Sequence, residues 1–209
     1  MAASLIFYTN PMSRGQIARW AIEETGAAYD TVLLDYTSTM KQEPFLSVNP
    51  MGKVPAIVHD GRVVTECAAI CAYLAEAFPD AGLAPTASER ADYYRWLFFA
   101  AGPVEQAITN RSMGFMPTAQ QFRMAGYGSY DMAIDVLEKA VSAHPYVAGD
   151  RFTAADVYVG SQVGWGLQFG TVPKRAAFEE YFARLSSRPA YIRAKAIDND
   201  LIAAAQAAG

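Results

Sequence analysis

The chain has 209 residues, of which 52% are hydrophobic and 18% are charged, and its formal net charge is −4. This balance is typical of a globular protein with a substantial core, built as one domain or as two small ones. The acidic balance and the scattered basic residues argue against a nucleic-acid-binding surface. No apolar run approaches the roughly 18 residues that span a bilayer, which argues against a membrane segment.

The N-terminus and the cysteines indicate a reducing compartment. The first residues, MAASLIFYTNP, lack the positive flank and the apolar length of a secretory signal peptide. Cys67 and Cys71 lie close together in a predicted helix, a placement poorly suited to a structural disulfide. We therefore expect a cytoplasmic protein.

Strands and helices alternate over the first part of the chain. The apolar run Leu5–Tyr8 predicts a short buried strand. Apolar residues at helical spacing predict a helix from Ser13 to about Gly26, and alternation over Tyr29–Leu34 predicts a second strand. A short helical turn is predicted over Glu43–Val48 and a longer helix over Thr65–Phe78.

The segment from Asn49 to Glu66, NPMGKVPAIVHDGRVVTE, predicts a hairpin, because Asp60-Gly61 is a strong turn signal between two apolar runs. Pro55 cannot donate a hydrogen bond to a sheet, so it is expected at a turn or an edge. If the Val54–Pro55 bond is cis, the backbone N–H and C=O of Val54 face outward and are free to pair with a peptide. The segment therefore predicts a peptide-binding edge.

The second half of the chain is predicted to be entirely helical. A turn-rich stretch over residues 79–85 precedes it. Thr153 and Asp156 have the spacing of a capping box. In such a box the threonine hydroxyl accepts from the backbone N–H of the aspartate, and the aspartate carboxylate accepts from the backbone N–H of the threonine. The predicted helices cover residues 88–113, 120–143, 153–170, 174–187 and 189–197.

Four ordered motifs resemble those of glutathione S-transferases. They are YTNPMSRG at Tyr8–Gly15, NPMGKVPAI at Asn49–Ile57, TECAAICAYL at Thr65–Leu74 and YVAGDRFTAADV at Tyr146–Val157. The resemblance covers essentially the whole chain. The chain resembles cytosolic members of the bacterial or theta-like type, which carry a serine at the catalytic position. It implies attack of glutathione thiolate on electrophiles, and a homodimer.

The resemblance also implies the domain organisation. The element order βαβ-α-ββα is the thioredoxin-like arrangement, a parallel pair followed by an antiparallel hairpin. We expect this thioredoxin-like, glutathione-binding domain over residues 1–79, a linker over residues 80–87, and an all-helical domain over residues 88–209 that contributes the electrophile site.

Ser13 matches the catalytic position of the resembling proteins. A hydroxyl that donates a hydrogen bond to the glutathione sulfur favours the reactive thiolate, as does a helix N-terminus aimed at it. Serine is also a preferred N-cap, so the residue by itself is equally compatible with a structural role. Tyr8 is the alternative, because other family branches use a tyrosine at the end of the first strand, although an aromatic side chain there is more often part of the core.

The resemblance assigns five residues to glutathione binding. Val54, before the expected cis Pro55, would pair its backbone with the cysteinyl unit. Glu66 would accept the γ-glutamyl ammonium, while the backbone and side chain of Cys67 would bind the γ-glutamyl carboxylate at a helix N-terminus. Lys53 is placed to meet a glutathione carboxylate, although a solvated turn lysine is nearly as plausible an interpretation.

Cys67 departs from the resembling proteins, which usually carry a serine there. A thiol is a poorer hydrogen-bond donor than a hydroxyl, but the backbone N–H remains able to hold a carboxylate. A cysteine at a helix N-terminus can also react with oxidised glutathione, so a mixed disulfide is one hypothesis and an inert, half-buried cysteine is the other.

An electrophile pocket between the domains is implied by the same resemblance. Methionine suits pockets that accept varied ligands, although most methionines and aromatic residues at helical spacing belong to the core. The candidate lining residues are Met12, Tyr94, Phe98, Met113, Phe115, Met116 and Trp165.

The sequence therefore favours a detoxifying glutathione transferase that acts on small hydrophobic electrophiles. Glutathione is expected as co-substrate, and no cofactor or metal is expected. The alternatives are a non-catalytic binding or regulatory protein of the same fold and a glutathione-dependent isomerase or reductase; fold alone separates none of these. The reductase is disfavoured because no cysteine stands at position 13 and no C-x-x-C motif is present.

Overall fold

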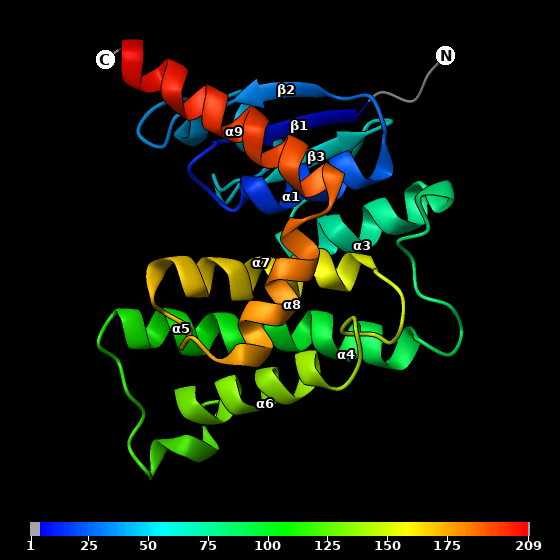
Figure 1. Cartoon of the computed structure of the whole chain (residues 1–209). Helices are drawn as coiled ribbons and strands as arrows, with labels where there is room; N and C mark the ends of the chain where they lie inside the picture. The colour runs from blue at the N-terminus through cyan, green and yellow to red at the C-terminus, as the bar shows by residue number, and fades with distance from the viewer. Residues whose placement is uncertain (1–4, 209) are drawn as a thin grey trace. The chain divides into compact units, whose positions relative to one another are not determined.

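The computed structural model describes residues 5–208. The chain forms two compact units, whose helices and strands are drawn in Figure 1. Unit 1 contains the residues up to Leu83 and those from Arg188 onward, and unit 2 runs from Ala84 to Ser187. No helix within residues 5–208 is long and apolar enough to cross a membrane.

Unit 1 contains a mixed four-stranded sheet in the order β2-β1-β3-β4. Its strands are β1 (Leu5–Thr9), β2 (Asp30–Leu33), β3 (Ala56–His59) and β4 (Arg62–Val64). β1 pairs with β2 in parallel and with β3 antiparallel, and β3 pairs with β4 antiparallel as the predicted hairpin. The parallel pair requires a crossover helix, whereas a tight turn suffices for the hairpin.

Three helices complete the predicted βαβ-α-ββα order. They are α1 (Gly15–Thr25), α2 (Phe45–Val48) and α3 (Cys67–Ala77), and 3-10 turns lie at Thr39–Lys41 and Pro79–Ala81. The thioredoxin-like prediction is therefore confirmed, with α1 beginning two residues later than expected and α3 also starting later.

Alternation along β1 sends successive side chains to opposite faces of the sheet. Phe7 is fully buried and lies under the Arg19 guanidinium of α1, whose central carbon is 5.1 Å from the ring centroid. Tyr8 points to the other face, where its ring centroid is 5.5 Å from that of Phe45 in α2. Leu34 and Met40 complete this second apolar cluster. The sheet is thus covered by α1 and α3 on one side and by α2 with its preceding turn on the other.

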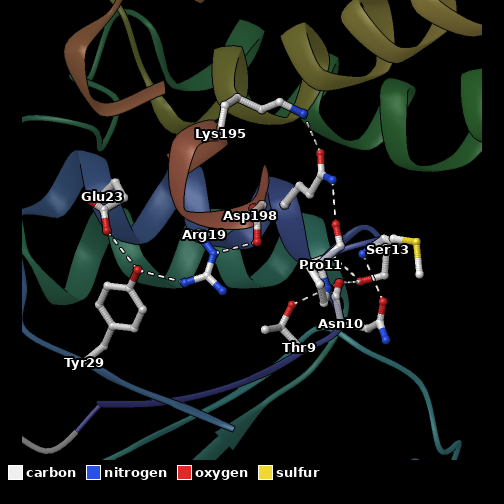
Figure 2. A network of polar contacts seen from close by, with 12 residues as sticks. Thr9, Asn10, Pro11, Ser13, Arg19, Glu23, Tyr29, Lys195 and Asp198 are labelled. Carbon is white, nitrogen blue, oxygen red and sulfur yellow. Dashed lines mark hydrogen bonds and ion pairs between the residues drawn. The ribbon is translucent and has the colours of Figure 1, made fainter. Parts of the chain in front are cut away.

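The last helix, α9 (Pro189–Ala208), packs against α1 and belongs to unit 1. This differs from the prediction, which assigned all of residues 88–209 to the helical domain and ended this helix near Ile197. The physical reason is a set of polar contacts between α9 and α1, and one of them is a buried ion pair, 2.8 Å long, between Asp198 and Arg19 (Figure 2).

Three further contacts place α9 antiparallel to α1. Arg188 holds both carboxylate oxygens of Glu24 at 2.7 and 2.8 Å, in a bidentate pair. Arg193 contacts the Glu23 carboxylate at 3.2 Å. Near the N-terminus of α1, the Lys195 ammonium donates to the Gln16 side chain. Burial raises the pKa of the Asp198 carboxyl, and the Arg19 guanidinium opposes this shift.

Unit 2 is helical, as predicted. Its elements are α4 (Arg90–Phe99), a π-helical turn (Ala100–Val104), α5 (Glu105–Ser112), a 3-10 turn (Gln121–Arg123), α6 (Tyr130–Ser142), α7 (Ala154–Phe169) and α8 (Ala176–Ser186). Within its described residues the only β pairing is an isolated bridge between Tyr146 and Gly149.

Two predicted helices of unit 2 differ from the structure. The helix over 88–113 is interrupted by the π-helical turn, which contains Pro103, because proline lacks the N–H that a regular α-helix needs there. The helix predicted from 120 begins only at Tyr130. Its N-cap is Ser129, whose side chain accepts from the backbone N–H of Met132 at 3.1 Å, and this local bond outcompetes continuation of the helix upstream.

The predicted capping box at Thr153 and Asp156 is present at the start of α7 and is completely buried. The Asp156 carboxylate accepts from the backbone N–H of Val147 at 2.7 Å and that of Thr153 at 2.9 Å. It also accepts from the Thr153 hydroxyl at 3.0 Å and the Tyr181 hydroxyl at 2.8 Å. Burial raises the pKa of the Asp156 carboxyl, and these four donors act in the opposite direction. The carboxylate thus joins the start of α7 to the preceding loop and to α8.

Candidate functional site

The loop between β1 and α1 carries Ser13, and Asn10 organises it. The Asn10 amide donates to the Leu34 carbonyl at 2.8 Å, which ties the loop to the end of β2. Its side-chain oxygen accepts from the backbone N–H of Met12 at 2.9 Å, a typical Asx turn. Asn10 is 8% exposed, so these bonds are shielded from solvent. The loop is therefore held on its sheet side by a buried amide, and the Tyr36 hydroxyl adds an exposed bond to the Met12 carbonyl at 3.2 Å.

Ser13 is half-buried just before α1 and has both a donor and an acceptor partner. Its hydroxyl donates to the Asn10 carbonyl at 2.6 Å and accepts from the Gly15 backbone N–H at 2.9 Å. The hydroxyl is thus already fixed at a helix N-terminus, where the partial positive charge favours an anion. A rotation about the Cβ–Oγ bond would redirect its O–H from the Asn10 carbonyl toward an anion bound in front of the helix, and the hydroxyl would keep its proton.

Gly15 is required by a close approach of the backbone to Thr9. A Cβ atom at this position would lie 1.9 Å from the Thr9 Oγ1 atom and 3.0 Å from the Ser13 Oγ atom. Real Cβ contacts are never so short, so any larger residue displaces the loop. The sequence position two residues after Ser13 is therefore restricted to glycine by packing.

Replacing Gly15 with alanine is expected to destabilise unit 1 by about 2 kcal/mol, a typical cost of overpacking a buried position. Thermal unfolding measures this change. Gly126→Ala is the control, because a Cβ there meets nothing within 4 Å. A second substitution, Thr9→Ala, removes the clashing hydroxyl and should recover part of the loss. Equal stability of the Gly15→Ala and Gly126→Ala variants would contradict this interpretation.

The Val54–Pro55 bond is cis, as the sequence led us to expect. The turn before it is built by Asn49, whose amide donates to the Lys53 carbonyl at 2.8 Å. The Lys41 ammonium braces the same turn by donating to the Gly52 carbonyl at 2.5 Å. β3 begins at Ala56, so Val54 lies outside the strand pairing. Its backbone is thus placed beside the sheet rather than within it.

The start of α3 has an unusual backbone conformation. Glu66, the N-cap, has φ +61° and an exposed side chain. Such a value is uncommon for a residue other than glycine and costs of the order of 1–3 kcal/mol. Strain of this kind accumulates at binding sites because the surrounding structure enforces it. Glu66 therefore presents an exposed carboxylate from a backbone conformation that the surrounding structure enforces.

Cys67 connects the start of α3 to the start of α1. Its thiol contacts the backbone carbonyl of Arg14 at 3.6 Å, and the residue is 8% exposed. The starts of two helices, one carrying Ser13 and the other Glu66, thus lie next to each other within unit 1. A buried thiol that donates to a carbonyl supports the inert interpretation of Cys67.

Tyr8 is positioned as a core residue. It is half-buried and packs with Phe45 against the apolar cluster on the α2 side of the sheet. Ser13, by contrast, lies at the helix start itself. This placement favours Ser13 over Tyr8 as the hydroxyl that faces a bound anion.

The predicted electrophile residues are mostly exposed. Tyr94 and Phe98 of α4 are stacked, with ring centroids 6.3 Å apart. Met12, Met113, Phe115 and Met116 are also exposed, and Trp165 is half-buried. A separate apolar pocket of about 500 Å³ lies within unit 2, and none of the predicted residues lines it. Its walls include Phe99, Pro103, Phe122, Tyr127 and Met132.

Two polar residues near the Ser13 loop were not recognised from the sequence. The Gln16 amide donates to the Pro11 carbonyl at 2.6 Å, and the Lys195 ammonium of α9 donates to the Gln16 side-chain oxygen at 2.8 Å. Burial lowers the pKa of Lys195, and the nearby Asp198 opposes this shift. No group of three or more metal-ligating side chains occurs within the described part of the chain.

Comparisons with known proteins match this architecture. Residues 3–76 match the family model described as glutathione S-transferase, N-terminal domain. A glutathione S-transferase of Escherichia coli O157:H7 is 28% identical over 178 residues, which cover 80% of this chain and 86% of the relative. A probable maleylacetoacetate isomerase of Caenorhabditis elegans is 31% identical over 151 residues, 68% of each chain. The chain belongs to the glutathione S-transferase family.

A solved glutathione S-transferase extends the likeness to the fold. The structure of a sphingomonad glutathione S-transferase complexed with glutathione aligns with a TM-score of 0.75 and 28% identity, covering 93% of this chain and 98% of that one. The protein is accordingly an enzyme of the glutathione transferase type. The loop of Ser13 and the start of α3 both lie within the segment that the N-terminal family model matches.

Proposed function

We propose that this glutathione transferase binds glutathione in unit 1 and activates its thiol for attack on small hydrophobic electrophiles. The observation that carries this proposal is the juxtaposition of the starts of α1 and α3 through the Cys67–Arg14 contact. The N-termini of α1 and α3 each favour an anion, and they lie next to each other. A glutathione molecule offers two such anions, its thiolate and its γ-glutamyl carboxylate.

Ser13 is proposed to stabilise the thiolate. The thiol proton leaves to solvent, and the Ser13 hydroxyl turns from the Asn10 carbonyl to donate to the sulfur. The backbone N–H of Gly15 keeps its bond to the Ser13 oxygen, which polarises the hydroxyl further. Each unit by which the thiol pKa falls corresponds to about 1.4 kcal/mol of preferential stabilisation of the thiolate.

The remaining contacts follow the chemistry of the tripeptide. The Glu66 carboxylate accepts from the γ-glutamyl ammonium, and the backbone N–H of Cys67 donates to the neighbouring carboxylate. The backbone of Val54, outside the strand ladder, pairs with the cysteinyl unit. The exposed Lys53 meets a glutathione carboxylate. No other cofactor and no metal is proposed.

The same proposal includes the wider setting of the enzyme. The exposed Met12 side chain of unit 1 and, separately, the exposed aromatic and methionine side chains of unit 2 are the candidate contacts for the electrophile. The protein is proposed to act as a homodimer, in the cytoplasm and in detoxification. Family membership supports the homodimer and the role in detoxification, and the sequence composition supports the cytoplasmic location.

The test is an assay with glutathione and a chloronitroaromatic compound. We expect turnover in which a carbon–sulfur bond forms, chloride leaves with the bonding electrons, and the thiol proton passes to solvent. Calorimetric titration with glutathione provides the binding readout. Binding without thiol transfer to any member of an electrophile panel would instead identify a non-catalytic glutathione-binding protein.

A second candidate is a glutathione-dependent isomerase. The relative from Caenorhabditis elegans, a probable maleylacetoacetate isomerase, favours it. In such a reaction the thiolate adds to a conjugated double bond and leaves again after rotation, so glutathione is not consumed. Following glutathione consumption and cis–trans conversion of an unsaturated diketo acid in parallel distinguishes the two reactions.

Replacing Glu66 with glutamine is expected to weaken glutathione binding about tenfold, with a smaller change in kcat. The reason is loss of a charge-assisted bond to an ammonium, worth about 1.4 kcal/mol. Glu76→Gln, at the exposed far end of α3, removes the same charge as a control. Calorimetry measures both dissociation constants, and equal values for the two variants would remove Glu66 from the site.

A further inference from the structure

Gln16 links the loop of Ser13 to the C-terminal helix. The residue lies in the first turn of α1 and is half-buried. Its amide nitrogen is 2.6 Å from the Pro11 carbonyl oxygen, and its amide oxygen is 2.8 Å from the Lys195 ammonium. Figure 2 shows Lys195 reaching from α9 toward the loop that contains Pro11 and Ser13.

The chemistry of the two partners fixes the orientation of the Gln16 amide. An ammonium only donates, so it must face the amide oxygen, and a carbonyl only accepts, so it must face the amide nitrogen. Exchange of the two amide atoms would place donor against donor and acceptor against acceptor. Lys195 thereby holds the Gln16 N–H on the Pro11 carbonyl.

The Pro11 carbonyl lies two residues before Ser13, in a loop that is otherwise held from the opposite side. There, the Asn10 amide donates to the Leu34 carbonyl at the end of β2. Pro11 has no N–H, so its carbonyl is the only backbone group by which the protein can hold this residue through a conventional hydrogen bond. The Tyr36 hydroxyl also donates to the Met12 carbonyl at 3.2 Å. The position of the Ser13 hydroxyl therefore depends on these contacts and on the bond from Gln16 of α1, which Lys195 of α9 orients.

We propose that Gln16, oriented by Lys195, is a positioning residue that fixes the Ser13 hydroxyl for its contact with the glutathione sulfur. This inference rests on the proposed function of Ser13. Gln16 acts through the Pro11 carbonyl and has no assigned contact with glutathione. The C-terminal helix thus takes part in thiol activation without contributing a group that touches substrate.

Two variants of Gln16 separate positioning from the docking of α9. Gln16→Glu retains an acceptor for Lys195, so α9 stays docked, but it has no N–H for the Pro11 carbonyl. Gln16→Met loses both bonds without adding charge. We expect both variants to raise the titration midpoint of bound glutathione by about half a unit to one unit. We also expect them to lower kcat/KM about threefold to tenfold near neutral pH, with a change of less than twofold in the glutathione dissociation constant.

The titration is followed through the ultraviolet absorbance of the thiolate in the complex of the full-length protein with glutathione. Lys195→Met is expected to shift it in the same direction by a smaller amount, because the amide is then free to turn. Arg193→Met removes a different α9–α1 contact, that to Glu23, and is expected to leave titration and kcat/KM unchanged. Thermal unfolding of every variant monitors the docking of α9 independently.

Combination with Ser13→Ala provides the decisive comparison. Because Gln16 acts through Ser13, the double variant Ser13→Ala/Gln16→Glu should be no less active than Ser13→Ala alone. A wild-type titration and wild-type kcat/KM in Gln16→Glu, together with a shift in Ser13→Ala, would overturn the positioning role alone. An unshifted titration in Ser13→Ala itself would overturn the proposed function, whatever the Gln16 variants show.

Discussion

Replacing Ser13 with alanine is expected to lower kcat/KM by about 10- to 100-fold near neutral pH. The substitution removes a hydrogen bond to a charged sulfur, worth about 1.5–3 kcal/mol, so the thiol of bound glutathione should titrate one to two units higher. The thiolate absorbance of the complex and the rate of conjugation measure the two effects. At high pH, where glutathione ionises without help, the difference in rate should shrink.

Tyr8→Phe is the matched control for Ser13→Ala, since it also removes one hydroxyl. The phenylalanine ring retains the packing against Phe45 and the apolar cluster around it. We expect activity within about twofold of the wild type, because no bond to the reacting sulfur is lost. Full activity of Ser13→Ala combined with loss of activity in Tyr8→Phe would transfer the role to Tyr8.

The second large effect is expected for stability. Asp156→Asn keeps the shape of the side chain but replaces one of its oxygens by an amide that donates. In either orientation the amide would face two donors: the N–H and hydroxyl of Thr153, or the Val147 N–H and Tyr181 hydroxyl. Unsatisfied buried groups of this kind cost about 3 kcal/mol together, which corresponds to a lowering of Tm by about 6–12 °C.

Asp150→Asn is the control for this substitution, because Asp150 is an exposed carboxylate in the same loop region. It is expected to change Tm by less than about 2 °C. Differential scanning calorimetry of both variants makes the comparison. An Asp156→Asn protein as stable as Asp150→Asn would mean that the four donors find other partners.

Most of the thioredoxin-like unit was predictable because its signals are local. The apolar spacing of α1 and the Asp60-Gly61 turn each act over a few residues, whereas the cis state of the Val54–Pro55 bond was expected from the family resemblance. The capping box at Thr153 and Asp156 is local as well. The predicted start of α6 at residue 120 is wrong because Ser129 caps the helix, which begins only at Tyr130.

The docking of α9 was not predictable from such signals. Arg19 and Asp198 are 179 positions apart in the chain, and each has the appearance of an ordinary charged residue on a helix. Within the candidate site, Ser13, Val54 and Glu66 were predicted from their motifs. Gln16 and Lys195 were not, because their importance depends on what the fold places next to them.

The return of α9 to α1 has a consequence for synthesis on the ribosome. The first 83 residues emerge long before Asp198, so the nascent thioredoxin-like unit has a guanidinium at Arg19 without the carboxylate that neutralises it in the finished protein. Burying an unpaired charge is strongly unfavourable. Unit 1 can therefore complete its core only after α9 has been made, when the contiguous helical unit 84–187 has already been synthesised.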